Sequence, residues 1–365
     1  MATIERERSL SPQSSVLSPI ESLEVAAYTI PTATPESDGT FEWTSTTLVA
    51  VHVAAGGKRG FGYSYADVAT AAFIRAHFVE LIVGRDAMAI DSAWAAMIRA
   101  VRNLGRRGVA AMAISAVDAA LWDLKCKLLG VPLVTLLGQV RDAAPVYMSG
   151  GFTSYSVAEL QEQLAGWPRA KMKVGRDARA DRERVRAVRE AIGDAELFVD
   201  ANGAYSRKLA LAQGRFFAEQ NVAWFEEPVS SDDLDGLKFL RDNLAMDIAA
   251  GEYGYELLYY ENMINSVDVI QADATRCLGI TGFIKTSALC EARGTPLSAH
   301  CAPSLHAHAA CALLPLRHVE YFFDHVRIES RYFDGFTEAV GGAMRPDLSR
   351  PGIGVELKAI DLEPL

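Results

Sequence analysis

The sequence has no long apolar segment and no run of basic residues. No stretch of its 365 residues approaches the ~20 consecutive apolar positions that span a bilayer. The formal net charge is −10, from 36 basic and 46 acidic residues, so nucleic acid and anionic membranes have little electrostatic attraction for it. We therefore expect neither as a partner. Because the N-terminus shows no apolar signal region, we expect a cytoplasmic location.

Cysteine is also scarce. The five cysteines are scattered along the chain, at Cys126, Cys277, Cys290, Cys301 and Cys311. An odd number without regular spacing does not suit a disulfide framework. We expect reduced thiols in the core.

The length and the apolar half of the composition suit an α/β barrel with a smaller domain attached. Residues 1–22 are rich in Ser, Pro and charge and are interpreted as a mobile tail. Residues 23–138 are expected to form an α+β capping domain and residues 139–335 a (β/α)8 barrel. Residues 336–365 are expected to return to the capping domain.

The expected capping domain begins with strands over residues 23–28 and 46–53. Their connection, residues 31–43, carries Phe41 and Trp43 among Pro, Gly and Asp. It is either an ordinary loop with an apolar anchor or a lid over a site. Helices are expected over three further segments, residues 65–82, 91–104 and 114–129. Gly130 and Pro132 end the last of these.

Three acids at equal intervals dominate the second part of the chain. Asp200, Glu226 and Glu252 are 26 residues apart, and each closes a short apolar run typical of a buried strand. Carboxylates at the ends of successive parallel strands converge, and their mutual repulsion requires a cation. An all-carboxylate set selects a hard ion. We therefore predict one Mg²⁺ per subunit, bound by these three residues.

Other ionisable residues continue this spacing in both directions. Lys173 precedes Asp200 by 27 residues, and Asp273, His300 and Glu320 follow Glu252. Seven consecutive strands therefore each end in one ionisable residue. In a (β/α)8 barrel this end of the strands carries the chemistry.

Two-residue spacing places further side chains on the same face. Lys171 shares a strand face with Lys173, and Asn202 shares that of Asp200. The alternative for the two lysines is a solvated pair at a sheet edge, which the apolar Val174 disfavours. Glu227, next to Glu226, faces the other way and suits a supporting role.

His300 gains significance from Asp273 on the preceding strand. A carboxylate beside an imidazole fixes its tautomer and raises its basicity, as a general base requires. The pair should lie about 2.6–3.2 Å apart. His306 and His308 follow in an Ala- and Leu-rich segment. A zinc site with His300 as third ligand is the less favoured interpretation, because no Cys or acid is spaced to complete it.

These residues resemble a known family, the mandelate racemase subgroup of the enolase superfamily. The similar pattern is Lys171-x-Lys173, Asp200-x-Asn202, Glu226-Glu227-Pro228, Gly251-Glu252, Asp273-x-x-Arg276, His300 and Glu320, with the segment Ser115 to Leu124 of the small domain. The muconate-lactonising subgroup is less similar, since it has a lysine at the sixth strand end. One departure is Cys277-Leu278-Gly279, where the family often has two glycines.

The resemblance implies removal of the proton α to a carboxylate, with Mg²⁺ held by the three acids. Lys173 and His300 would flank a small carboxylate substrate on opposite faces, and either could be the base. Lys171 and Glu320 would hold the substrate carboxylate away from the metal. Asn202, Arg276, Phe41 and Trp43 are the expected substrate contacts.

Two opposed bases allow dehydration as well as racemisation or epimerisation. Many relatives with this lysine and His–Asp arrangement dehydrate acid sugars, so a Mg²⁺-dependent acid-sugar dehydratase is favoured, with racemase or epimerase as the alternative. A metal-dependent hydrolase would need a His-x-His on the first barrel strand, which is absent. A non-catalytic role would be expected to lose a ligand or a base, and none is lost. We also expect a homo-oligomer.

Overall fold

The computed structural model describes residues 18–358. Most of the expected N-terminal tail, residues 1–17, lies outside them. For residues 18–22 that expectation is wrong. Ile20 is buried, its backbone N–H donates to the carbonyl of Arg85, and Ser22 already begins the first strand.

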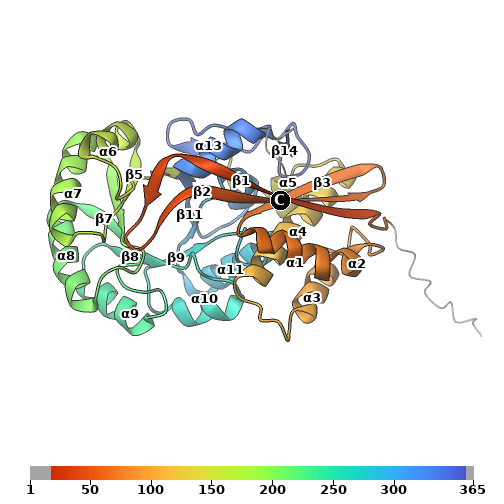
Figure 1. Cartoon of the computed structure of the whole chain (residues 1–365), viewed down its shortest axis with the longest axis horizontal. Coiled ribbons are helices and arrows are strands. Elements are labelled where there is room, and N and C mark those ends of the chain that lie inside the picture. Colours follow the sequence, from red (N-terminus) through yellow and green to blue (C-terminus); the bar gives the residue numbers. More distant parts are fainter. Residues whose placement is uncertain (1–17, 359–365) are drawn as a thin grey trace, which may run out of the picture.

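The capping domain opens with a three-stranded antiparallel sheet of β1 (Ser22–Ser37), β2 (Glu42–Ala55) and β3 (Lys58–Tyr65). β1 and β2 are far longer than predicted, so the expected loop of residues 31–43 is mostly strand, with a register shift between Pro31 and Glu36. Continued backbone pairing outweighs the local signals of Pro and Gly. The resulting β1–β2 ribbon runs across the barrel. Its turn lies beside the ends of barrel strands, on the side away from the capping helices (Figure 1).

Helices pack on one face of this sheet. α1 (Val68–His77), α2 (Val79–Ile82) and α4 (Val109–Leu129) contact the strands, and α3 (Ile90–Ala100) packs against α2 and α4. The single helix expected over residues 65–82 is two helices, and Tyr65 belongs to β3. Gly130 ends α4 in a left-handed conformation, as predicted. α4 lies so close to β3 that a Cβ at Gly62 would be 2.3 Å from the backbone nitrogen of Ala120.

Eight parallel strands then form the closed barrel that the spacing predicts. They are β4 (Ala144–Ser149), β5 (Arg169–Lys173), β6 (Glu196–Asp200), β7 (Val222–Glu226), β8 (Asp247–Ala250), β9 (Val269–Ala272), β10 (Leu297–Ala299) and β11 (Leu316–Phe322). β11 pairs with β4 and closes the ring, with Val319 opposite Val146. Aromatic rings of Tyr147, Phe198 and Trp224 fill the interior below the strand ends.

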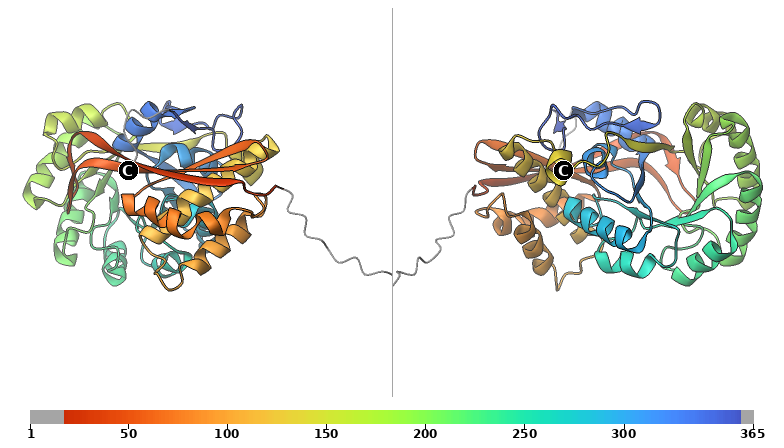
Figure 2. Two further views of the ribbon diagram at one scale, coloured as in Figure 1. Left: turned by 45° about the vertical axis from the view of Figure 1, so that its right-hand side comes forward. Right: turned by 180° about the vertical axis from the view of Figure 1, so that it is seen from behind.

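Helices that precede, connect or follow the barrel strands lie outside the barrel (Figures 1 and 2). They are α5 (Leu133–Leu137), α6 (Val157–Leu164), α7 (Ala178–Ile192), α8 (Arg207–Glu219), α9 (Leu234–Asn243), α10 (Leu257–Met263), α11 (Gly279–Arg293), α12 (Pro303–Ala310) and α13 (Phe323–Tyr332). α7 shows how the local sequence forms such a helix. Asp177 caps its first turn, and Val185, Val188 and Ile192 form its buried stripe. Among the described residues, no helix combines the length and apolar character that crossing a membrane requires.

The end of the chain contacts both parts of the molecule. Three short strands lie here, β12 (Phe333–Asp334), β13 (Ala343–Met344) and β14 (Glu356–Leu357). β13 pairs with β4 of the barrel. Asp123 of α4 accepts the Ile353 N–H at 2.8 Å, which ties the same segment to the capping domain.

Candidate active site

A cavity of about 460 Å³ opens where the capping sheet faces the C-terminal ends of the barrel strands. The barrel contributes most of the charged side chains, and the β1–β2 turn, β2 and the end of β3 contribute aromatic and hydroxyl side chains. Its lining comprises Asp38, Phe41, Trp43, Ser45, Thr46, Thr47, Tyr65, Ala66, Asp67, Lys173, Asn202, Glu252, Tyr253, Arg276, His300, Cys301, Glu320, Phe322 and His325. The segments that form it are far apart in sequence.

The three evenly spaced acids meet on the barrel side, where Glu252 lines the cavity. Asp200 and Glu226 are the last residues of β6 and β7, and Glu252 follows β8 by two residues. Each offers a carboxylate oxygen within 4.8 Å of the others, and all three are buried. Burial, and then the charge of Asp200, raise the pKa of Glu226 to about 8. A buried set of oxygen donors in mutual repulsion fits a hard divalent cation.

Two lysines on β5 contact this cluster. Lys171 Nζ lies 2.6 Å from Glu226 Oε1 and 2.8 Å from Glu320 Oε1, while Lys173 Nζ bonds to Asp200 Oδ2. Both are buried, so the solvated-edge interpretation is wrong. Burial alone would lower the pKa of Lys173, but the charge of Asp200 outweighs it and raises that pKa. Each ammonium is therefore matched by acids, which is the condition for burying it.

The predicted dyad has the expected geometry. His300 Nδ1 lies 2.9 Å from Asp273 Oδ2, and both residues are buried. The other ring nitrogen, Nε2, lies 3.2 Å from Glu252 Oε2 and 3.3 Å from Cys301 Sγ. Because Asp273 is bound at Nδ1, Nε2 is the nitrogen that remains for chemistry in the cavity.

Electrostatics make the dyad a charged pair. Burial alone would raise the pKa of Asp273, but the hydrogen bond and charge of His300 lower it to about 2. Burial opposes the charging of His300, yet neighbouring groups raise its pKa well above the usual value. Burial raises the pKa of the Cys301 thiol to about 12, so the thiol is neutral near pH 7. The carboxylates of Glu252, Glu320 and Asp273 therefore raise the pKa of His300.

The expected substrate contacts also line the cavity. Asn202, with φ of +45°, keeps a buried Oδ1 without a hydrogen bond, and Arg276 pairs with Glu252 at 3.5 Å. Phe41 and Trp43 stack with ring centroids 6.3 Å apart, and Phe41 is 65% exposed. An aromatic held in a long β-ribbon over charged groups favours the lid interpretation of residues 31–43.

His325 is a cavity residue that the sequence interpretation missed. It lies on α13, its Nδ1 accepts the Ala302 N–H at 3.2 Å, and its ring stacks on Tyr65 at 3.4 Å. Burial lowers its pKa to about 3, so the ring is neutral near pH 7. Its Nε2 then carries the proton and is a neutral donor. Its place shortly after the last barrel strand was the available signal.

His306 and His308 do not line the cavity. Both are buried in α12. His306 Nε2 accepts the Ala274 N–H at 3.0 Å, and His306 Nδ1 bonds to the Cys301 carbonyl at 2.9 Å. These contacts support helix packing rather than the zinc site that the sequence analysis disfavours.

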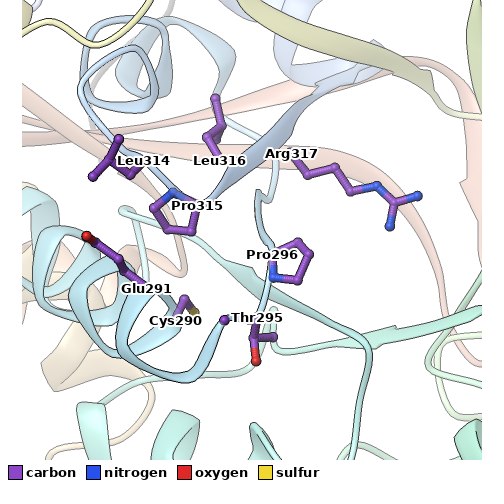
Figure 3. Close-up of a pocket in the computed structure, with 9 residues that line it drawn as sticks. Cys290, Glu291, Thr295, Pro296, Leu314, Pro315, Leu316 and Arg317 are labelled. Carbon is purple, nitrogen blue, oxygen red and sulfur yellow. The ribbon is translucent and has the colours of Figure 1, made fainter.

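A second cavity, of about 590 Å³, lies at the opposite ends of β10 and β11 (Figure 3). Leu314, Pro315 and Pro296 give it apolar walls, and the Arg317 guanidinium points away from Pro315. No set of convergent ionisable groups lines it, so the chemistry belongs to the first cavity.

Family comparisons agree with this geometry. The family model of the mandelate racemase / muconate lactonizing enzyme N-terminal domain matches residues 25–138, and that of the enolase C-terminal domain-like family matches residues 156–361. The chain belongs to the mandelate racemase / muconate lactonizing enzyme family of the enolase superfamily. The predicted family and fold are thereby confirmed.

Individual relatives cover most of the chain. It is 36% identical to L-talarate/galactarate dehydratase of Salmonella typhimurium, over 83% of this chain and 82% of that enzyme. A mandelate racemase/muconate lactonizing enzyme-like protein from Rubrobacter xylanophilus is 52% identical, with a TM-score of 0.92 over 93% of this chain and 97% of that one. A racemase from Streptomyces coelicolor, solved with bound magnesium, is 32% identical, with a TM-score of 0.88 over 93% and 97%.

Proposed function

We propose that this chain is a Mg²⁺-dependent lyase that dehydrates an acid sugar to a 2-keto-3-deoxy acid. The observation that carries the proposal is a buried carboxylate triad on β6 to β8 flanked by two potential bases. Lys173 lies on β5, on one side of these strands, and the His300–Asp273 dyad follows β9 and β10 on the other. The dehydratase relative and the magnesium-bound relative support the reaction type and the ion.

Asp200, Glu226 and Glu252 would hold the ion. When bound, Mg²⁺ supplies positive charge that offsets the charge developing on the substrate carboxylate. Lys171 and Glu320, paired at 2.8 Å, would contact that carboxylate from the other side. Because Asp200 would serve the ion as well as Lys173, it would bind the lysine proton less strongly in the loaded enzyme, which suits Lys173 to act as a base.

Either Lys173 or His300, after giving up its own proton to solvent, removes the proton at C2. The group on the other side, in its protonated form, donates a proton to the departing 3-hydroxyl, so that water leaves and an enol remains. The enol then tautomerises to the 2-keto-3-deoxy acid. If no acid reaches the hydroxyl, C2 is reprotonated instead and the enzyme is an epimerase; the racemase relative keeps this alternative open.

The capping side of the cavity fits a hydroxylated substrate. Ser45, Thr46 and Thr47 bring hydroxyl groups to it, and the neutral His325 of α13, stacked on Tyr65, brings a donor. The charged side chains that the capping domain contributes to the cavity are the carboxylates Asp38 and Asp67. A second substrate carboxylate would be repelled there, so we propose that mono-acid sugars are preferred to diacids.

The test is a screen of mono- and diacid sugars with Mg²⁺, reading formation of 2-keto-3-deoxy product. We expect turnover of at least one mono-acid, lost with His300→Asn. Turnover of diacids alone would overturn the mono-acid preference. Epimerised acids without any keto acid would overturn dehydration.

The homo-oligomeric state expected from the sequence stays a prediction.

A further inference from the structure

A second set of possible metal ligands lies beside the carboxylate triad. His300 Nε2, Cys301 Sγ and Glu320 Oε2 converge, with Sγ 3.3 Å from Nε2, Sγ 3.4 Å from Oε2 and Nε2 3.6 Å from Oε2. All three residues are buried, and all three line the active-site cavity. An ion in the cavity can therefore reach them.

The distances match one face of a zinc tetrahedron. With Zn–S of about 2.3 Å and Zn–N or Zn–O of about 2.0–2.1 Å, neighbouring ligand atoms lie roughly 3.3–3.6 Å apart. The three measured separations fall in this range. The fourth vertex would face the cavity, where water or a ligand could occupy it.

The surrounding structure already holds these ligands in place. Cys301 and Ala302 adopt positive φ angles of 51° and 40°, a turn that brings the thiol beside the imidazole of the preceding residue. Glu320 Oε2 accepts the Cys301 N–H at 3.0 Å. Asp273 binds His300 through Nδ1. A carboxylate–imidazole–metal chain of this kind is common around zinc ligands.

The ligand types separate this cluster from the triad. Thiolate and imidazole donors favour zinc, whereas three carboxylates favour magnesium. We propose that His300, Cys301 and Glu320 form a distinct Zn²⁺ site, and that zinc bound there inhibits the enzyme by occupying His300 Nε2. On binding, the Cys301 thiol and the protonated His300 Nε2 each release one proton to solvent. The inhibitory part rests on the proposed function, and the binding part does not.

Cobalt(II) tests binding directly, because a cobalt–thiolate bond gives a charge-transfer absorption that oxygen ligands do not. The enzyme is saturated with Mg²⁺ and titrated with Co²⁺, and Zn²⁺ is then added in competition. We expect one absorbing site per chain, displaced by Zn²⁺ and lost in Cys301→Ser. Cys311→Ser is the matched control, since Cys311 is buried but does not line the cavity.

Calorimetry of Zn²⁺ binding in the same Mg²⁺ buffer gives the affinity. Removing a supporting contact of a metal ligand typically costs about 10- to 100-fold, so loss of the thiolate should weaken zinc by at least about tenfold. Absence of the band in the native enzyme, or its survival in Cys301→Ser, overturns the site. Once a substrate is known, equal zinc inhibition of the native enzyme and Cys301→Ser would overturn the inhibitory role, even with the band present.

Discussion

The two walls of the active-site cavity are built from different interactions. On the barrel side, Lys171, Lys173 and His300 each contact a carboxylate within 3 Å, and the three carboxylates come from different strands. On the capping side, hydrogen bonds within and beyond the β1–β2 ribbon hold the aromatic and hydroxyl groups in place. Trp43 Nε1, for example, donates to Glu36 at 3.0 Å. Charge pairing across strands therefore fixes the positions of the ionisable groups, and we expect one ribbon from the other domain to contact the substrate.

Substitution in the barrel wall, the charged residues at the strand ends, should have the largest effect on catalysis. Glu226→Gln removes one charge from the triad, so bound Mg²⁺ should weaken and kcat should fall about 10⁴-fold, the effect of losing several kcal/mol of charge stabilisation. Steady-state kinetics and metal analysis measure both. Glu196→Gln, on an exposed glutamate at the start of β6, serves as control. Activity retained in Glu226→Gln, or after dialysis against EDTA, would remove the metal site.

Substitution in the His300–Asp273 dyad should cause the next largest loss of kcat. His300→Asn removes a general acid–base, which contributes about 10²–10⁴-fold, and we expect a loss of about 10³ in kcat. The unfolding midpoint should change little, since Asn keeps a polar partner for Asp273. His77→Asn, at an exposed position of α1, is the control. A large loss of stability with normal kcat would make His300 a structural residue.

The capping wall should act on binding. Phe41 is 65% exposed, so Phe41→Ala should leave folding intact. It should raise KM about tenfold with little change in kcat, because about 1.4 kcal/mol of contact with the substrate is lost equally in the ground and transition states. Leu348→Ala, at another exposed apolar site, should leave KM unchanged. A fall in kcat alone would argue against a recognition role for the ribbon.

The smallest effect concerns pH. Burial, and then Asp324, raise the pKa of Glu36 to about 8. Since the folded pKa exceeds the unfolded one, Glu36 contributes most stability below about pH 4.5. This contribution is lost as the pH rises to about 8. Glu36→Gln should reduce this loss of folding stability, by roughly 1 kcal/mol or more at pH 8. The control Glu42→Gln, at an exposed position, should leave the loss unchanged. Parallel curves for native enzyme and Glu36→Gln in thermal melts from pH 5 to 8 would contradict this.

Regular spacing made the barrel wall predictable. A βα unit repeats, so the position of Asp200 constrains those of Glu226 and Glu252, and a strand's two-residue period places Lys171 with Lys173. The capping wall has no such repeat. Strand length in the β1–β2 ribbon depends on pairing that outweighs Pro31 and Pro35.

The cavity residues that were missed depend on tertiary contacts. Cys301 reaches Glu320 because two residues adopt positive φ, and residue types alone do not specify that turn. His325 reaches the cavity from α13 through its contacts with Tyr65 and Ala302. Sequence spacing specified neither contact.

Reaction in D₂O with a turned-over acid sugar and Mg²⁺ tests the central claim most directly. If Lys173 or His300 takes the C2 proton and the 3-hydroxyl leaves, the product is a 2-keto-3-deoxy acid with deuterium at C3, introduced when the enol tautomerises. NMR and mass spectrometry detect it. A recovered C2 epimer with deuterium at C2, and no keto acid, would contradict the account and make the enzyme an epimerase.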